Sequence, residues 1–323
     1  MYKIYDRWPE IAKESFDADY DVVDFKNIDH IVFAGMGGSG TVGDIFSSIL
    51  SKTKIHVCVV KGYLLPKTVD SNTLVVTTSI SGNTVETLTV LDSAKKIDAK
   101  IIAFSSGGKM KEYCMKNKIE HINIPQLHSP RASFTAFLYS MLHVLGNIVN
   151  VKKEDISDSI HKLEDLRTQI SSANLTKENT SLKLAQWITG MPIIYYPWGL
   201  QAAAIRFKNS LQENSKLHAM AEDVIEASHN GIVAWEKPSN VQPILIEGED
   251  DYIKTKERWK ILKDYFKENK IDYWEVHSVK GSILSKLINL IYLLDYCTIY
   301  KAVLFKTSPS HIQSIDFVKK RLG

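Results

Sequence analysis

The sequence predicts an α/β protein of two lobes, each a parallel β-sheet flanked by helices. Three observations lead to this fold class. The chain has 323 residues, more than the roughly 100–200 of a typical domain. Short β-branched runs alternate with helix-length amphipathic segments, as in parallel sheets. These runs stop between about residues 134 and 186 and then resume, which divides the chain into residues 1–150 and 151–323.

The expected strands are short and almost wholly apolar, as strands covered by helices on both faces should be. In the first lobe they are IVFAG at 31–35 and residues 55–60, 73–79, 100–105 and 119–124. In the second lobe they are residues 191–197, 241–248 and 272–278. Apolar residues at helical spacing between the two sets predict a helical connection.

Charge and cysteine usage exclude several classes of protein. The 40 basic and 37 acidic residues leave a formal charge of +3, too balanced for a general nucleic-acid or membrane surface. Three widely spaced cysteines indicate neither a disulfide framework nor a zinc site. The apolar stretch at 287–296 is broken by Asn289 and Asp295 and is shorter than a membrane span, so a buried helix is expected. With no signal-peptide core near the N-terminus, a cytoplasmic location is expected.

The first motif with chemical meaning is GMGGSG at 35–40, directly after a predicted strand and before a helix. Glycines let the backbone approach a ligand closely, and the helix N-terminus favours an anion. A nicotinamide nucleotide site is the rival interpretation. It would need an acid at the end of the second strand, where this chain has Lys61 and Gly62.

The second motif is TTSISGNTVETL at 77–88, where hydroxyl side chains precede another predicted helix. Hydroxyls and free backbone amides together can bind phosphate oxygens. The alternative is a simple serine or threonine cap. Because both motifs follow strands of one parallel sheet, they are expected to face one pocket at its carboxyl edge.

These two motifs together resemble a sugar isomerase (SIS) domain, and the whole chain resembles the archaeal-type bifunctional phosphoglucose/phosphomannose isomerases. The resemblance continues through PRASF at 130–134, RFKNSLQENSK at 206–216, EASHNGIVAW at 226–235 and IDFVKKRL at 315–322. It implies two SIS-type subdomains and an isomerase of carbohydrate metabolism. That enzyme would interconvert glucose 6-phosphate, and mannose 6-phosphate, with fructose 6-phosphate through a cis-enediolate, with no metal or nucleotide cofactor.

The resemblance also implies roles for individual residues. The phosphate cradle would comprise Gly37, Gly38, Ser39, Ser79, Ser81 and Thr84. Glu213 would be the base that moves the proton between C2 and C1, and Arg131 would stabilise the enediolate. His229 would open the sugar ring from across a homodimer interface, although His218 stays an alternative. Lys319 would assist ring opening, with Lys320 and Lys301 as alternatives.

Other functions stay open on the sequence alone. A noncatalytic SIS module that senses a sugar phosphate needs the cradle but has no use for Glu213, Arg131 and His229 together. The isomerase half of a hexosamine synthase would need a further amide-hydrolysing domain. A metal-dependent mannose isomerase would need clustered histidine and acidic ligands, and the ten histidines show no such spacing.

Overall fold

The structure, a computed structural model that describes residues 1–322, has the predicted α/β fold with two parallel sheets flanked by helices. The N-terminal lobe comprises Asp6–His161. The C-terminal lobe runs from Lys162 to the C-terminus and also includes Met1–Tyr5. This division falls inside α8 (Lys153–Ile170), and the boundary expected from the sequence between residues 150 and 151 stays a prediction.

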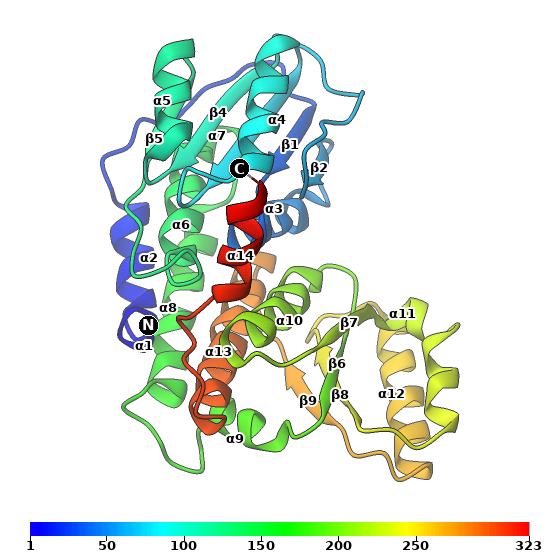
Figure 1. Cartoon of the computed structure of the whole chain (residues 1–323). Coiled ribbons are helices and arrows are strands. Elements are labelled where there is room, and N and C mark those ends of the chain that lie inside the picture. The colour runs from blue at the N-terminus through cyan, green and yellow to red at the C-terminus, as the bar shows by residue number, and fades with distance from the viewer. Residues whose placement is uncertain (323) are drawn as a thin grey trace. The chain divides into compact units, whose positions relative to one another are not determined.

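The N-terminal lobe contains a sheet of five parallel strands in the order β2-β1-β3-β4-β5. The strands are β1 (His30–Ala34), β2 (His56–Val60), β3 (Thr73–Ser79), β4 (Lys100–Ser105) and β5 (Glu120–Asn123), as Figure 1 shows. All five occupy the predicted runs. The chain starts at β1, moves outward to β2 and returns past β1 to β3. The direction of winding therefore changes between β1 and β3, which is where open sheets of this kind bind ligands.

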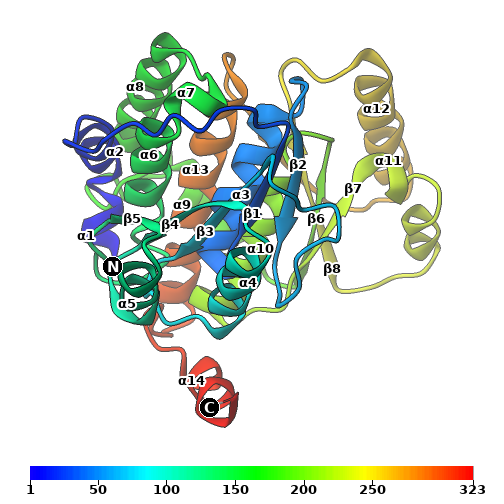
Figure 2. The ribbon, with the colours of Figure 1, turned by 90° about the horizontal axis from the view of Figure 1, so that it is seen from above.

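Helices cover both faces of this sheet (Figure 2). They are α2 (Trp8–Phe16), α3 (Gly37–Leu50), α4 (Val85–Lys96), α5 (Gly108–Asn117), α6 (Phe134–Val144) and α7 (Gly146–Val149). Residues alternate between the two faces, as side chains along a strand must. Val32 and Val75 pack with α4 and α5 in one core cluster. On the other face, the ring of Phe33 stacks on Phe46 of α3 with centroids 5.0 Å apart.

The C-terminal lobe contains a four-stranded parallel sheet in the order β7-β6-β8-β9. The strands are β6 (Met191–Tyr196), β7 (Met220–Asp223), β8 (Val241–Glu247) and β9 (Trp274–His277). Three match the predicted runs, whereas β7 was not predicted. It is four residues long, two of them acids, and lies at the sheet edge, so it lacks the apolar pattern of a covered strand.

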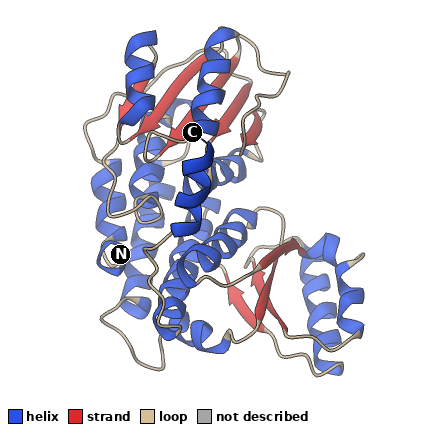
Figure 3. Ribbon diagram, viewed as in Figure 1, coloured by secondary structure: helices blue, strands red, loops and turns tan. Residues whose placement is uncertain are grey.

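Helices flank this sheet as well, with α10 and α12 on opposite sides (Figure 3). The helices are α1 (Tyr2–Tyr5), α9 (Thr180–Trp187), α10 (Gln201–Ser215), α11 (Val224–Ala227), α12 (Ile253–Glu268), α13 (Ile283–Leu304), α14 (Gln313–Leu322) and the short 3₁₀ helix η1 (Gly231–Glu236). α12 packs its apolar side on β6 and β8 through Trp259, Leu262 and Phe266.

Helix α13 is the central helix of this lobe. Within the described residues it alone has the length and apolar composition of a membrane span, but 83% of its most apolar window is buried inside the protein, as in a core helix. The expected buried helix around 287–296 is thus confirmed. The N-terminal helix α1 packs against α13: Tyr5 donates a hydrogen bond to Asp295 (3.1 Å), and Tyr292 donates one to the Tyr5 carbonyl (2.7 Å).

Candidate active site

The turn between β1 and α3 forms the first half of the cradle. Gly37 opens α3 with φ +53°, a left-handed conformation that glycine adopts without strain. The residue at the N-cap, Met36, has no side chain that can cap the helix, and no side-chain cap bond is present there. Gly38 and Ser39 complete the first turn, with Gly38 partly exposed and Ser39 buried. An anion approaching this end would meet backbone amides and the positive end of the helix dipole.

The turn between β3 and α4 forms the second half. Ser79 is buried at the end of β3 and donates a hydrogen bond to Thr84 Oγ1 (2.9 Å). Ser81 Oγ accepts one from the amide of Asn83 (3.3 Å). Thr84 occupies the N-cap position of α4, yet its side chain makes no cap bond to the helix. The simple-cap interpretation therefore does not describe Thr84, and the start of α4 has no side-chain cap.

The structure brings the two turns together. Ser39 Oγ, from the first turn, accepts a hydrogen bond from the amide of Ile80 in the second (3.3 Å). Strands β1 and β3 are direct neighbours in register, with Ala34 opposite Thr77. Two helix N-termini without side-chain caps and four hydroxyl groups thus lie at the point where the strand order reverses.

Two residues that support the cradle were not singled out from the sequence. Gly82 has φ +71°, and a Cβ there would lie 1.8 Å from the carbonyl oxygen of Gly107, so only glycine fits. Asn83 Oδ1 accepts a hydrogen bond from the amide of Lys109 in the first turn of α5 (3.1 Å). Both residues belong to the SGNT motif, and their contacts pack this turn on the next one.

A positive charge lies beside the cradle. Lys61, at the end of β2, forms an ion pair with Asp44 of α3 (2.5 Å). The stem of this lysine passes Gly40, where an added Cβ would lie 3.1 Å from Lys61 Cε. Burial raises the pKa of Asp44, and the neighbouring lysine partly offsets that rise. The residue that argued against a nucleotide site is therefore paired with an acid at this edge of the sheet.

Arg131 lies in the same lobe as the cradle, just before α6. Its side chain is buried, 7% exposed. Trp8 donates a hydrogen bond to the carbonyl of the next residue, Ala132 (3.1 Å), which fixes this turn against α2. The proposed role of Arg131 in stabilising an enediolate stays a prediction.

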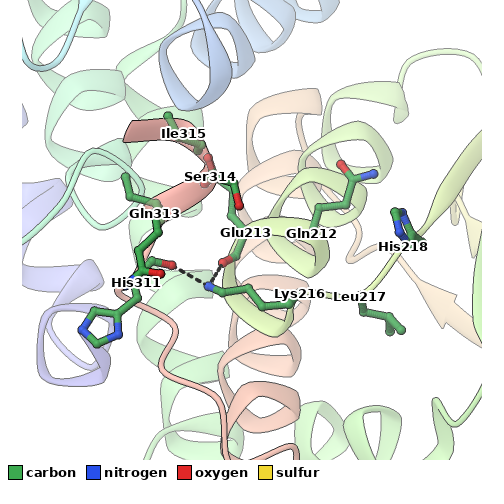
Figure 4. Close-up of a pocket in the computed structure, with 10 residues that line it drawn as sticks. Gln212, Glu213, Lys216, Leu217, His218, His311, Gln313, Ser314 and Ile315 are labelled. Carbon is green, nitrogen blue, oxygen red and sulfur yellow. Dashed lines mark hydrogen bonds between the residues drawn. The ribbon is translucent and has the colours of Figure 1, made fainter. Parts of the chain in front are cut away.

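In the C-terminal lobe, Glu213 borders a cavity of about 600 Å³. Residues 212, 213 and 216–218 at the end of α10 line one side, and residues 311–315 before and within α14 line the other. Figure 4 shows Glu213 at the centre of this group, with the ring of His311 pointing away from it. Glu213 is half-buried, the setting expected of a carboxylate base that must reach substrate.

A buried polar seam fixes the helix that carries Glu213. Arg206 of α10 forms an ion pair with Asp295 of α13 (2.6 Å), with exposures of 3% and 0%. Ser210 donates a hydrogen bond to the same carboxylate (2.9 Å), and Asn214 donates one to Thr298 (2.8 Å). Burial alone would lower the pKa of Arg206, but the adjacent carboxylate raises it, so the guanidinium stays charged. These contacts are spaced along α10 and set the rotation of the helix. They therefore also set the direction of Glu213, which lies between Ser210 and Asn214.

The two candidate histidines occupy different surroundings. His229 is exposed on the turn that follows α11, and it does not line the cavity beside Glu213. His218 does line it. Within one chain, His218 is thus the histidine closer to the predicted base, and the assignment of ring opening to His229 stays a prediction that depends on a second copy of the chain.

The three candidate lysines also differ. Lys319 and Lys320 are exposed on α14. Lys301 is buried in α13, where it donates a hydrogen bond to the carbonyl of Ile188 and lies over the ring of Phe305. Burial lowers its pKa. These contacts give Lys301 a structural role, which leaves the lysines of α14 as the candidates for ring opening.

One cluster has the donor types of a metal site. Glu247, Glu275 and His277 have donor atoms within 4.8 Å of one another at the carboxyl edge of the C-terminal sheet. The ammonium group of Lys263 already lies there, 3.0 Å from Glu247 and 3.1 Å from Glu275. Since this lysine pairs with both carboxylates, the cluster fits an internal ion-pair network better than a cation site.

Comparison with known families agrees with this arrangement of two lobes. Residues 24–138 match the SIS domain family, and residues 177–322 match the family described as bacterial phospho-glucose isomerase C-terminal SIS domain. The fold also resembles a solved hypothetical protein from Thermus thermophilus, with a TM-score of 0.74 over 99% of this chain and 90% of that one at 13% identity. Fold and site thus define a protein with two SIS domains.

Relatives that match over most of the chain identify which family of SIS-domain proteins it belongs to. A bifunctional phosphoglucose/phosphomannose isomerase of Caldicellulosiruptor bescii is 33% identical over 100% of this chain and 99% of its own. A D-glucosamine-6-phosphate 4-epimerase of Sulfolobus acidocaldarius is 31% identical over 76% of this chain and 77% of its own. The chain belongs to the bifunctional phosphoglucose/phosphomannose isomerase family, whose substrates are sugar phosphates.

Proposed function

We propose that this protein is a cofactor-free aldose–ketose isomerase that interconverts glucose 6-phosphate, and also mannose 6-phosphate, with fructose 6-phosphate in the cytoplasm. The observation that carries the proposal is the position of Glu213. It is a half-buried carboxylate on a firmly anchored helix, at the border of a cavity large enough for a hexose. A sugar-phosphate sensor would have no need of such a group.

The reaction requires an acidic C–H bond to be broken and remade one carbon away. With the sugar ring open, Glu213 takes the proton from C2 of the aldose. The electron pair of that C–H bond forms the C1–C2 double bond while the electrons of the C1 carbonyl move to O1, which gives a cis-enediolate. The proton of the C2 hydroxyl passes to O1, the C2–O2 bond becomes the carbonyl, and the same carboxyl group delivers its proton to C1, which gives the ketose. A positioned base of this kind contributes roughly 10²–10⁴-fold to the rate.

The phosphate and the enediolate need different groups. The proposed phosphate site is the cradle, where uncapped amides at the starts of α3 and α4 and the hydroxyls of Ser39, Ser81 and Thr84 offer donors. Arg131 is the proposed partner of the enediolate oxygen, because a guanidinium supplies permanent charge. One of the lysines on α14, Lys319 or Lys320, assists ring opening.

We further propose a homodimer in which His229 of one chain serves the other. Its exposure on the turn after α11 supports this arrangement, since the residue does not line the cavity of its own chain. Mixing two inactive variants, Glu213→Gln and His229→Ala, tests it. After subunit exchange, about a quarter of the sites would regain both groups if the histidine crosses the interface. If His229 acts within its own chain, no activity returns.

The primary test is an NMR assay of the purified protein in D2O with glucose 6-phosphate and with mannose 6-phosphate. Fructose 6-phosphate from both sugars, with deuterium at C1, is the expected result. Product from glucose 6-phosphate alone would restrict the proposal to one epimer. The assay is repeated with EDTA, and a loss of activity that metal restores would contradict the cofactor-free mechanism.

Two further substrates separate the alternatives. If glucosamine 6-phosphate changes configuration at C4 while the other sugars do not react, the chemistry of the Sulfolobus relative applies instead. If fructose 6-phosphate binds with neither turnover nor exchange of its C1 protons, a sensor function replaces the isomerase.

A further inference from the structure

Lys216 connects the end of α10 to the segment that precedes α14. Its ammonium group donates hydrogen bonds to three backbone carbonyls, those of Glu213 (2.5 Å), His311 (2.7 Å) and Ser308 (3.2 Å). An ammonium group has three N–H donors, so each carbonyl receives one. The first carbonyl belongs to the last turn of α10, where the helix leaves acceptors unsatisfied and where its dipole favours a cation.

The segment reached by these bonds has little other regular structure. Residues 307–312 form neither helix nor strand, and α14, which follows, has no buried residue. Three of its apolar side chains, Phe317, Val318 and Leu322, are more than half exposed. Two charge-assisted bonds from one lysine tie this segment to the end of α10.

The same segment is a wall of the cavity beside Glu213. Residues 311–315 face the end of α10, and Lys216 lies between the two walls (Figure 4). Because Lys216 bonds to the carbonyl of Glu213 and to that of His311, it sets the spacing between them. The distance of the predicted base from the start of α14 thus depends on one side chain.

We propose that Lys216 is a positioning residue, which clamps residues 308–311 onto the C-terminus of α10 and thereby sets the wall of the Glu213 cavity and the place where α14 begins. The expected effect of Lys216 on turnover rests on the proposed isomerase function. The expected effect on how well residues 308–311 are held in place is independent of that function. The lysines of α14 follow directly in the chain, so the clamp also sets where their helix starts.

Lys216 could instead act only as the residue that ends α10. Substitutions that change its backbone preference and its side-chain donors separately distinguish this role from the clamp. Lys216 ends α10 in a left-handed conformation, φ +57°, which costs a non-glycine residue free energy. Lys216→Gly removes that cost and the clamp together, Lys216→Met removes only the donors, and Lys216→Arg keeps donors and charge. Lys306 is the matched control, because it has φ +53° at the other end of the same segment and contributes no side-chain bond to it.

The first measurement is hydrogen exchange of the full chain, read at the amides of Ile315 and Asp316 in the first turn of α14, which donate to the carbonyl of Ile312. Exchange is expected to be on the order of 10-fold faster in Lys216→Met and Lys216→Gly, as loss of charge-assisted bonds predicts. In Lys216→Arg and Lys306→Met it should stay within about threefold of the unmodified protein. Unchanged exchange in both the Met and Gly variants overturns the clamp.

The second measurement is steady-state turnover. The Met and Gly variants are expected to lose on the order of 10- to 100-fold in kcat with KM within about threefold, because misplacement acts on the chemical step, and Arg should restore kcat. Faster exchange with wild-type kcat would overturn the positioning role. If the unmodified protein turns over no sugar phosphate while exchange responds as expected, the proposed function fails and the clamp stands.

Discussion

The two lobes share one architecture but differ at the carboxyl edges of their sheets. In the N-terminal lobe β1 is followed by Gly35 and β3 ends at Ser79, and the helices that follow these two strands begin without side-chain caps. In the C-terminal lobe three of the four strands end in acids or a histidine, at Asp223, Glu247 and His277. Asp223 there caps α11 by accepting from the amide of Ile225 (2.8 Å), and Glu247 pairs with Lys263.

The difference shows that two sheets of the same fold can offer opposite surroundings to an anion at their carboxyl edges. An edge with open amides attracts anions, whereas one lined with carboxylates repels them and neutralises itself through internal pairs. In the C-terminal lobe the candidate chemistry instead lies at the end of a helix, where Glu213 borders the cavity. One lobe thus offers neutral donors for binding, and the other offers charged groups for proton transfer.

The largest expected effect comes from the charged group of the C-terminal lobe. Glu213→Gln removes the base but keeps the shape of the side chain. A loss of roughly 10²–10⁴-fold in kcat with little change in KM is expected, because the proposed phosphate contacts are in the other lobe. Steady-state kinetics with glucose 6-phosphate measures this, and wild-type turnover would remove Glu213 from the mechanism.

The next effect concerns stability. Asp295→Leu leaves the buried Arg206 without its carboxylate, and such changes cost about 3–5 kcal/mol of unfolding free energy. The matched double variant, Arg206→Met with Asp295→Leu, removes both charges and should recover part of that loss, while the hydroxyls of Tyr5 and Ser210 still lack this acceptor. Chemical denaturation of the two variants gives the comparison. Equal stability of the single and double variants would contradict a tightly coupled pair.

A smaller effect on the unfolding free energy is expected at alkaline pH from a buried cysteine of the N-terminal lobe. Burial raises the pKa of Cys114 to about 11 from 9.0, so the folded protein retains a thiol that the unfolded chain ionises. The stabilisation is complete below pH 9 and is lost as pH rises through 11. The stability difference between wild type and Cys114→Ala should therefore shift by about 2–3 kcal/mol against wild type between pH 8.5 and 11. A pH-independent difference in denaturation would contradict this.

The smallest effect is expected at the neutral edge of the N-terminal lobe. Ser81→Ala combined with Thr84→Ala removes two hydroxyls, and a rise in KM on the order of 10-fold with kcat nearly unchanged is expected. Ser93→Ala, on the exposed side of α4, is the control because its hydroxyl bonds only to the carbonyl of Thr89. If the double variant and this control give the same KM, Ser81 and Thr84 do not bind phosphate.

The fold and the cradle could be predicted because their signals are local. The alternation of strands and helices, the glycine turn and the hydroxyl turn each occupy a few consecutive residues. The polar seam could not be predicted in this way, since Arg206 and Asp295 are 89 positions apart and no spacing rule joins them. In the sequence Asp295 only interrupts an apolar stretch, whereas in the structure it is the acceptor that orients α10.

Lys216 shows a second limit of the sequence. The residue stands in the QENSK block beside the predicted base, but its three acceptors are backbone carbonyls, two of them more than 90 positions away. A backbone carbonyl has no identity in a sequence, so no pattern of side chains could indicate these bonds. The same holds for Gly82, whose neighbour is the carbonyl of Gly107.

The first five residues have a consequence for synthesis on the ribosome. Tyr5 is made before the whole N-terminal lobe, yet the atoms it bonds with belong to Tyr292 and Asp295, which are translated after that lobe. The nascent chain therefore carries α1 without these partners while the N-terminal lobe is made, and this closure joins residues 290 positions apart. An extension fused ahead of Met1 would therefore be attached to the C-terminal lobe, although the residues that follow Tyr5 in the sequence form the N-terminal lobe.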